Sequence, residues 1–335
     1  MNPQPIMTAK IISEAEIDRS LVKIILIGFL IVATVFSFTY FLDFSFKNFQ
    51  FRYLFFAAAS VAVALILIIL SVFYIKSFNK LIIIAFLSSF ISLASFYPNL
   101  SAVIVIGAFV FFVFFLLAYY RGFKVVNNLI KIRFFFVASS ILPKAATAFL
   151  LFATFVFFNY YFDIESNRFN DNLNKIFVAS FVKISEPVFK IFLSNFSFQD
   201  STDELIKLVV EKRINSLIPD FSRYPSTVKE KILNEAFIEF KKNIEKQIGL
   251  VEGNKPFSET VFDLIKTNLD NLAEKEKIVF AIVFSFILFF IIKGISLFFY
   301  WLIKLLAFIL FKALIAVNFA YISLENKSRE FVILT

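Results

Sequence analysis

The sequence offers few side chains that could carry out chemistry. It contains no histidine and no cysteine, so thiolate nucleophiles, histidine-based triads, Cys/His zinc sites and histidine-ligated haem are excluded. Carboxylates remain as candidates for acid–base catalysis or calcium binding. Two groups have suitable spacing: Glu235 with Glu239, and Asp200 with Asp203 and Glu204.

Both carboxylate groups also have a structural interpretation. Glu235 and Glu239 alternate with lysines on a polar helix face, which is typical of a solvated surface. Asp203 and Glu204 fall in a first helical turn, where the helix dipole favours acids. We therefore expect neither group to form a catalytic or metal site.

Serine–lysine catalysis needs no histidine. Ser139, Ser140 and Lys144 lie close together in the sequence, but the pattern supplies no oxyanion hole. The phosphate-binding patterns GxxxxGK[ST] and GxGxxG do not occur. Basic residues stand beside apolar segments instead of clustering on a soluble surface, which argues against nucleic acid. We expect no enzymatic activity, no cofactor, no nucleotide and no nucleic-acid partner.

The elements that must carry these residues are membrane helices. The chain has 335 residues, of which 60% are hydrophobic, a composition typical of integral membrane proteins. Each crossing needs ~20 apolar residues. A turn at Tyr97–Ser101 divides one long uncharged run into a hairpin. The five expected spans are Ile24–Leu42, Tyr53–Ile75, Leu81–Tyr97, Ala102–Tyr120 and Ala145–Phe162.

Lysine and arginine in the short loops predict the orientation in the cell membrane. Of the basic residues in these short loops, a cytoplasmic N-terminus leaves only Lys47 and Arg52 outside. The same orientation places residues 163–276 outside the cytoplasm. The inner side then holds Lys10, Arg19, Lys23, Lys76, Lys80, Arg121, Lys124, Lys131, Arg133 and Lys144. No acidic residue lies between Phe44 and Phe162 or between Lys277 and Leu324, which disfavours a proton- or cation-coupled transporter.

Residues 163–276 show helical periodicity and little strand signal. Ser201 and Glu204 have capping-box spacing at the start of a helix pattern. A later pattern begins near Pro256, and neither proline nor glycine interrupts it between Phe257 and Lys293. We therefore expect one continuous helix that leads from this domain into the sixth span.

Two basic segments leave alternatives open. Arg121–Lys144 either forms a short helix in the inner interface or extends the fourth span. After Lys293, which can snorkel to the inner headgroups, the chain either lies in the interface as an amphipathic helix or forms a seventh span across Ile303–Tyr321. A seventh span would hold Lys312 near its centre at a cost of ~3 kcal/mol, so we favour six crossings. The expected lipid-headgroup contacts at the inner interface are Arg121, Lys124, Lys131, Arg133, Lys293 and Lys304.

These patterns predict an all-α integral membrane protein. It has about six transmembrane helices, and a helical extracytoplasmic domain is inserted between the fifth and the sixth. The expected parts are a cytoplasmic N-terminal segment 1–21, a five-span membrane domain 22–162, the extracytoplasmic domain 163–276, a sixth span with an interfacial helix or seventh span 277–322, and a C-terminal tail 323–335.

Three functions are compatible with this architecture. The favoured one is a non-catalytic multi-pass envelope component, embedded among membrane lipids, whose residues 163–276 bind a protein partner. The second is a passive transporter, channel or lipid-handling protein that uses the five-span bundle. The third, a membrane enzyme that relies on the outer carboxylates or on serine and lysine, has the least support.

Overall fold

The structure is a computed structural model that describes residues 20–50, 52–97, 100–192, 197, 199–218, 221–248, 253–325 and 329–334. Nearly all of the expected N-terminal segment 1–21 lies outside these described residues. The chain divides into two compact units. Residues up to Tyr160 and from Ala281 onward form the first, called here the bundle, and Tyr161–Phe280 form the second, called the inserted unit. Most of the described chain is helical, which confirms the all-α class.

Apolar sequence explains the helices of the bundle, because a helix satisfies its own backbone hydrogen bonds in lipid. Five described helices are long and apolar enough to cross a membrane, which indicates a membrane protein. Helix α4 is shorter, with 17 residues, or about 26 Å. The bundle helices are α2 (Leu21–Lys47), α3 (Arg52–Tyr74), α4 (Phe78–Ala94), α5 (Ala102–Asn128), α6 (Phe134–Tyr161) and α11 (Glu274–Ala316).

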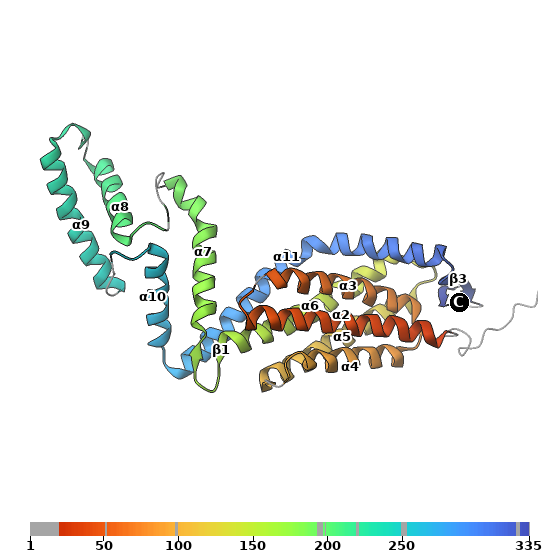
Figure 1. The fold of residues 1–335 in the computed structure, drawn as a ribbon. Coiled ribbons are helices and arrows are strands. Elements are labelled where there is room, and N and C mark those ends of the chain that lie inside the picture. The colour runs from red at the N-terminus through yellow and green to blue at the C-terminus, as the bar shows by residue number, and fades with distance from the viewer. Residues whose placement is uncertain are drawn as a thin grey trace, which may run out of the picture. The chain divides into compact units, whose positions relative to one another are not determined.

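The interior of the bundle is aromatic. Helix α2 packs against α3 and α4, and α5 packs against the same two helices (Figure 1). The ring of Phe149 in α6 lies 5.3 Å from that of Phe38 in α2 and 5.1 Å from that of Phe111 in α5, both edge-on. All three rings are buried. Aromatic contacts therefore join α6 to the other helices.

Glycines permit the closest helix contacts within the bundle. A Cβ atom at Gly107 of α5 would lie 2.7 Å from Cβ of Phe155 in α6. At Gly122 it would lie 2.6 Å from Cγ1 of Ile141. By contrast, a Cβ at Gly294 of α11 would meet no atom within 4 Å. The first two glycines are therefore packing positions, and Gly294 is not.

Helix α5 settles one of the open alternatives. It continues without a break through Arg121 and Lys124 to Asn128, so this segment extends the predicted fourth span. The connection to α6 occupies only residues 129–133.

Helix α6 begins at Phe134, well before the predicted start near Ala145, and it contains Pro143. Packing explains the early start. The ring of Phe134 stacks on Phe73 of α3 at 5.0 Å and lies 5.2 Å from Phe311 of α11. These contacts stabilise a first helical stretch despite the hydrogen bond that Pro143 cannot donate.

Helix α11 does not end near Lys293 as expected. It runs unbroken for 43 residues, and its buried side chains continue beyond Lys293 with Tyr300, Ile303, Ala307 and Phe311. A Schellman arrangement ends it: Asn318 has φ 57°, its N–H donates to Ile315 O at 3.1 Å, and the Phe319 N–H donates to Leu314 O at 2.9 Å.

The end of the chain forms a two-stranded hairpin where the sequence indicated only a tail. Strand β3 (Ala320–Glu325) pairs antiparallel with β4 (Arg329–Leu334), and β4 contacts α3. The approach to the hairpin is tied to α2, because Lys23 of that helix donates to the carbonyl oxygen of Phe319 at 2.9 Å.

The inserted unit is a set of amphipathic helices of 14 to 23 residues with two small apolar cores. One core joins α7 to α10 around Val178 and Val182, and the other joins α8 to α9 around Ile206 and Val210. The elements are β1 (Phe162–Asp163), β2 (Arg168–Phe169), α7 (Asp171–Phe192), α8 (Thr202–Leu217), the short 3-10 helix η1 (Phe221–Arg223), α9 (Ser226–Ile248) and α10 (Phe257–Asp270). The capping box of α8 is confirmed: Ser201 Oγ accepts the Glu204 N–H at 3.2 Å, and Glu204 Oε2 accepts the Ser201 N–H at 3.1 Å.

The predicted continuous helix from Pro256 into the sixth span is wrong. Helix α10 ends at Asp270, and α11 begins at Glu274. The carboxylate of Glu276 accepts the N–H of Ala273 at 3.0 Å, which satisfies a donor at a new helix start. Residues 271–273 therefore separate the two helices without proline or glycine, and Glu276 caps the second one.

The glycine contacts give a matched pair of variants. We expect Gly107→Ala to destabilise the bundle by about 1–3 kcal/mol, because the added methyl group overlaps Phe155. Gly294→Ala should be neutral or stabilise α11 by up to about 1 kcal/mol, since its site is open. Thermal unfolding midpoints of the two purified variants in one detergent test this. A lower midpoint for Gly294→Ala than for Gly107→Ala would contradict the packing described.

Candidate functional site

The carboxylates singled out in the sequence have structural roles in the inserted unit. Asp203 Oδ1 accepts Lys241 Nζ at 2.8 Å, and Asp200 Oδ2 accepts the N–H of Ser197 at 2.9 Å. Glu204 closes the capping box. Glu235 and Glu239 are exposed on α9. Within the described residues no three acidic side chains gather as metal ligands would.

The two serines of the serine–lysine group considered in the sequence have separate partners. Ser139 Oγ accepts Lys304 Nζ of α11 at 3.3 Å, so its partner comes from another helix than Lys144. The Ser140 hydroxyl donates to the carbonyl oxygen of Val137 at 2.7 Å, a contact within α6. The two hydroxyl groups thus have different partners.

The six cations expected at lipid headgroups fall into two sets. Arg121 and Lys124 are exposed near the end of α5, and Lys131 and Arg133 are exposed in the connection to α6. Lys293 and Lys304 both contact side chains or backbone of α6. The other four stand at the end of the bundle where α5 and α6 are joined.

Lys293 has the larger set of contacts. Its Nζ donates to the carbonyl oxygen of Pro143 at 3.0 Å and to the hydroxyl of Thr147. That hydroxyl in turn donates to the same carbonyl at 2.6 Å. The ring of Tyr300, one of the buried residues of α11, lies 6.0 Å from the ammonium, at the limit of a cation–π contact. An apolar helix therefore places a charged group against neutral oxygens of α6.

The sequence analysis missed one carboxylate of the membrane helices. It ended the first span at Leu42, whereas α2 continues to Lys47 and includes Asp43. The Asp43 carboxylate accepts the hydroxyl of Tyr160, so the pair joins the final turns of α2 and α6. The four-residue spacing of Asp43 and Lys47, which supports a helix, was the available signal.

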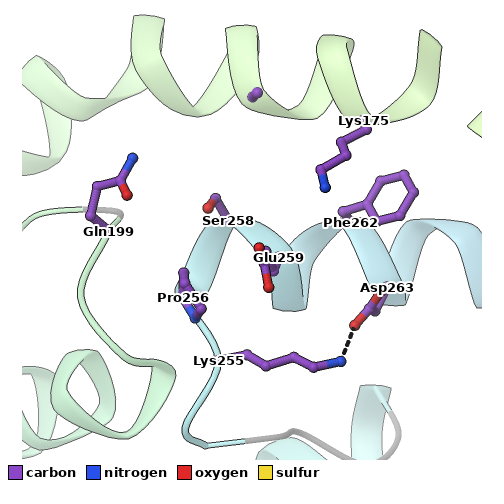
Figure 2. Close-up of a pocket in the computed structure, with 9 residues that line it drawn as sticks. Lys175, Gln199, Lys255, Pro256, Ser258, Glu259, Phe262 and Asp263 are labelled. Carbon is purple, nitrogen blue, oxygen red and sulfur yellow. Dashed lines mark hydrogen bonds and ion pairs between the residues drawn. The ribbon is translucent and has the colours of Figure 1, made fainter. Parts of the chain in front are cut away.

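The inserted unit contains a groove of about 330 Å³ between α7 and the start of α10. Figure 2 shows Lys175 reaching from α7 toward Phe262 of α10. The ammonium of Lys255 pairs with Asp263 at 2.9 Å along one wall. The lining residues are Lys175, Ala179, Gln199, Lys255, Pro256, Ser258, Glu259, Phe262 and Asp263.

Polar contacts hold the walls of this groove in place. The buried hydroxyls of Thr202 and Thr260 lie 2.8 Å apart, and the Thr202 N–H donates to Lys255 O at 3.0 Å. At the other end of α10, Lys266 pairs with Asp171 at the start of α7, and this carboxylate raises the pKa of the Lys266 ammonium. Helix α10 is therefore tied to the start of α8 near its own first turn and to the start of α7 near its own last turn.

No family model, no curated protein and no solved structure matches the chain. Its function is therefore inferred from the sites described above.

The structural role of Asp203 can be tested through its neighbour Gly253. A Cβ at Gly253 would lie 2.1 Å from Oδ2 of Asp203. The carboxylate of Asp203 is held in place by its ion pair with Lys241. We expect Gly253→Ala to destabilise the inserted unit by about 1–3 kcal/mol. Hydrogen exchange of the peptides that cover α8 and α10 should accelerate. The exposed Glu235→Ala variant serves as the control and should leave these exchange rates unchanged. Equal exchange rates in the two variants would contradict the close contact between Gly253 and Asp203.

Proposed function

We propose that the protein is a non-catalytic multi-pass component of the cell membrane whose residues 163–276 lie outside the cytoplasm and bind a partner protein. In this proposal α2–α6 make five crossings, α11 makes the sixth, and the N-terminus is cytoplasmic. The loop charges of the sequence support this orientation.

The path of α11 supports a single sixth crossing. Its Phe284 lies 6.1 Å from Phe157 in the last turns of α6, and its Phe311 lies 5.2 Å from Phe134 at the other end. Helix α11 therefore runs antiparallel to α6, alongside nearly the whole length of α6. A seventh span would need a reversal of the chain, and α11 continues without one to Ala316.

The observation that carries the binding role is the groove of Figure 2. Small-molecule pockets are mostly apolar and concave, with few polar groups. This groove is lined by two lysines and two carboxylates, which suits a charged segment of another protein. The structural use of Asp200, Asp203 and Glu204 supports a non-catalytic role for the same unit.

The topology can be mapped with single cysteines, because the natural chain has none. We expect Lys47→Cys and Glu239→Cys to react with a membrane-impermeant maleimide in intact cells. Lys124→Cys and Lys312→Cys should react only after permeabilisation. All four positions are exposed, and the parent chain provides the unlabelled control. Labelling of Lys124→Cys in intact cells would contradict the proposed orientation and indicate the opposite one.

Partner binding can be tested by cross-linking in native membranes followed by mild-detergent purification. The wild type should retain a stoichiometric protein partner. The charge-reversed variant Lys175→Glu/Glu259→Lys should lose at least about tenfold in recovery, corresponding to ~1.4 kcal/mol.

The matched control is Lys231→Glu/Glu235→Lys, which reverses two exposed charges on α9 and keeps the net charge. It should recover the partner as well as the wild type does. Recovery of the wild-type protein alone, or equal recovery by the groove variant, would overturn the proposed function.

A further inference from the structure

Two lysines of α11 converge on one short stretch of α6. Lys293 and Lys304 are eleven residues apart, a rise of about 16 Å along the helix. Their contacts on α6 are Ser139 for Lys304, and Pro143 with Thr147 for Lys293. Along α6, Ser139 is separated from Pro143 by about 6 Å of rise and from Thr147 by about 12 Å. The two long side chains therefore bring their charges closer together than their backbone positions are.

The depth of this stretch follows from the ring contacts around it. The rings of Phe134 and Phe311 both contact the ring of Phe73. Phe73 lies two residues before Ile75, where an uncharged run ends and Lys76 follows. This level marks the inner end of the bundle in the proposed orientation. Ser139 lies just over one turn above it, and Thr147 lies between three and four turns above it. Lys293 is thus held well inside the apolar zone, and Lys304 near its inner edge.

These two charges lack an acidic counterpart in the part of the bundle that the structure describes. Asp43 is engaged with Tyr160 in the opposite end, and Glu274 and Glu276 stand in the first turn of α11. Charged side chains at membrane depth are costly unless paired. The neutral oxygens of Ser139 and Pro143 satisfy hydrogen bonds but do not neutralise charge.

We propose that the surface where α6 and α11 meet around Lys293 and Lys304 binds the phosphate group of an anionic phospholipid, with these two lysines as its cationic ligands. An ammonium group has three donors, so each lysine can add a phosphate oxygen to its contacts with α6. The half-buried Lys144, next to Pro143 on α6, adds a third positive charge to this stretch.

The surroundings of the two lysines favour a lipid as the source of the phosphate. Four-residue spacing places Leu297 and Trp301 on the same face of α11 as Lys293, and both side chains are more than half exposed. On α6 the exposed ring of Phe135 lies 5.1 Å from Phe308 and forms an apolar edge. Acyl chains can cover these surfaces, whereas a free phosphate ion would leave them uncovered.

This site requires the bundle to lie in a bilayer but does not require a protein partner. Failure of the lipid experiment therefore leaves the groove of the inserted unit untouched. Loss of partner binding would equally leave the lipid site untouched.

The single tryptophan of the chain, Trp301, is a reporter for the site. We would reconstitute the full chain in phosphatidylcholine vesicles and measure quenching of its fluorescence by a few mole per cent of brominated phosphatidylglycerol or brominated phosphatidylcholine. We expect the anionic lipid to be enriched at least about tenfold beside the wild-type protein. Lys293→Gln/Lys304→Gln should abolish this enrichment. The control Lys124→Gln/Lys131→Gln removes the same charge from exposed positions and should retain it.

Equal quenching by the two lipids in the wild type, or enrichment that persists in Lys293→Gln/Lys304→Gln, would overturn the proposal. Loss of the enrichment on addition of inorganic phosphate would overturn the lipid as the source and identify a free-anion site. If the glutamine variant does not fold, Lys293→Arg/Lys304→Arg should keep the enrichment. In that case Lys304→Gln alone, which leaves the Lys293 contacts in place, should reduce the enrichment several-fold, and an unchanged value would overturn the proposal.

Discussion

Helix α11 packs against the bundle along one stripe of buried side chains. The contacts between α11 and α6 at one end of the bundle depend on this packing. The stripe runs through Ala281, Ser285 and Phe289 to Ala307 and Phe311, all buried. Most other side chains of α11 face away, with Phe298 85% exposed. Lipid is as apolar as these side chains, so close packing and polar contacts must align the helix. Lys293 and Lys304 supply two of these polar contacts.

Pro143 links the packing of α11 on α6 to the polar contacts of Lys293. Proline has no N–H to donate, so it weakens the helix that contains it. The ring contacts of Phe134 with α3 and α11 keep α6 helical before the proline. The carbonyl oxygen of Pro143 then accepts both Lys293 and the Thr147 hydroxyl. A position that is unfavourable for the isolated helix therefore becomes the place where two helices exchange polar contacts.

The inserted unit uses its polar residues differently. Caps, hydroxyl pairs and ion pairs hold together helices whose two apolar cores are small. Such a unit needs these contacts because a small core stabilises little by itself. The groove lined by Lys175 and Glu259 is where charged side chains remain available beside this framework. A binding role for the unit is consistent with that division.

The local sequence was enough to predict the features that depend on local chemistry. Apolar runs identified the membrane helices, and Ser201 with Glu204 identified the start of α8, because composition and spacing alone decide these. It also showed how few catalytic side chains exist. The break before Glu274 was missed, although it is local, because an apolar pattern does not reveal the contact of Glu276 with Ala273.

Tertiary structure decided where the helices end and what their charges contact. The sequence predicted headgroup contacts for Lys293 and Lys304 through snorkelling, but it did not indicate their partners within the protein. In the folded chain their partners are 150 and 165 residues away, in α6. The early start of α6 at Phe134 likewise depends on rings of α3 and α11. Contacts between segments so distant in the chain leave no periodic signal in either one, so only the packed bundle determines them.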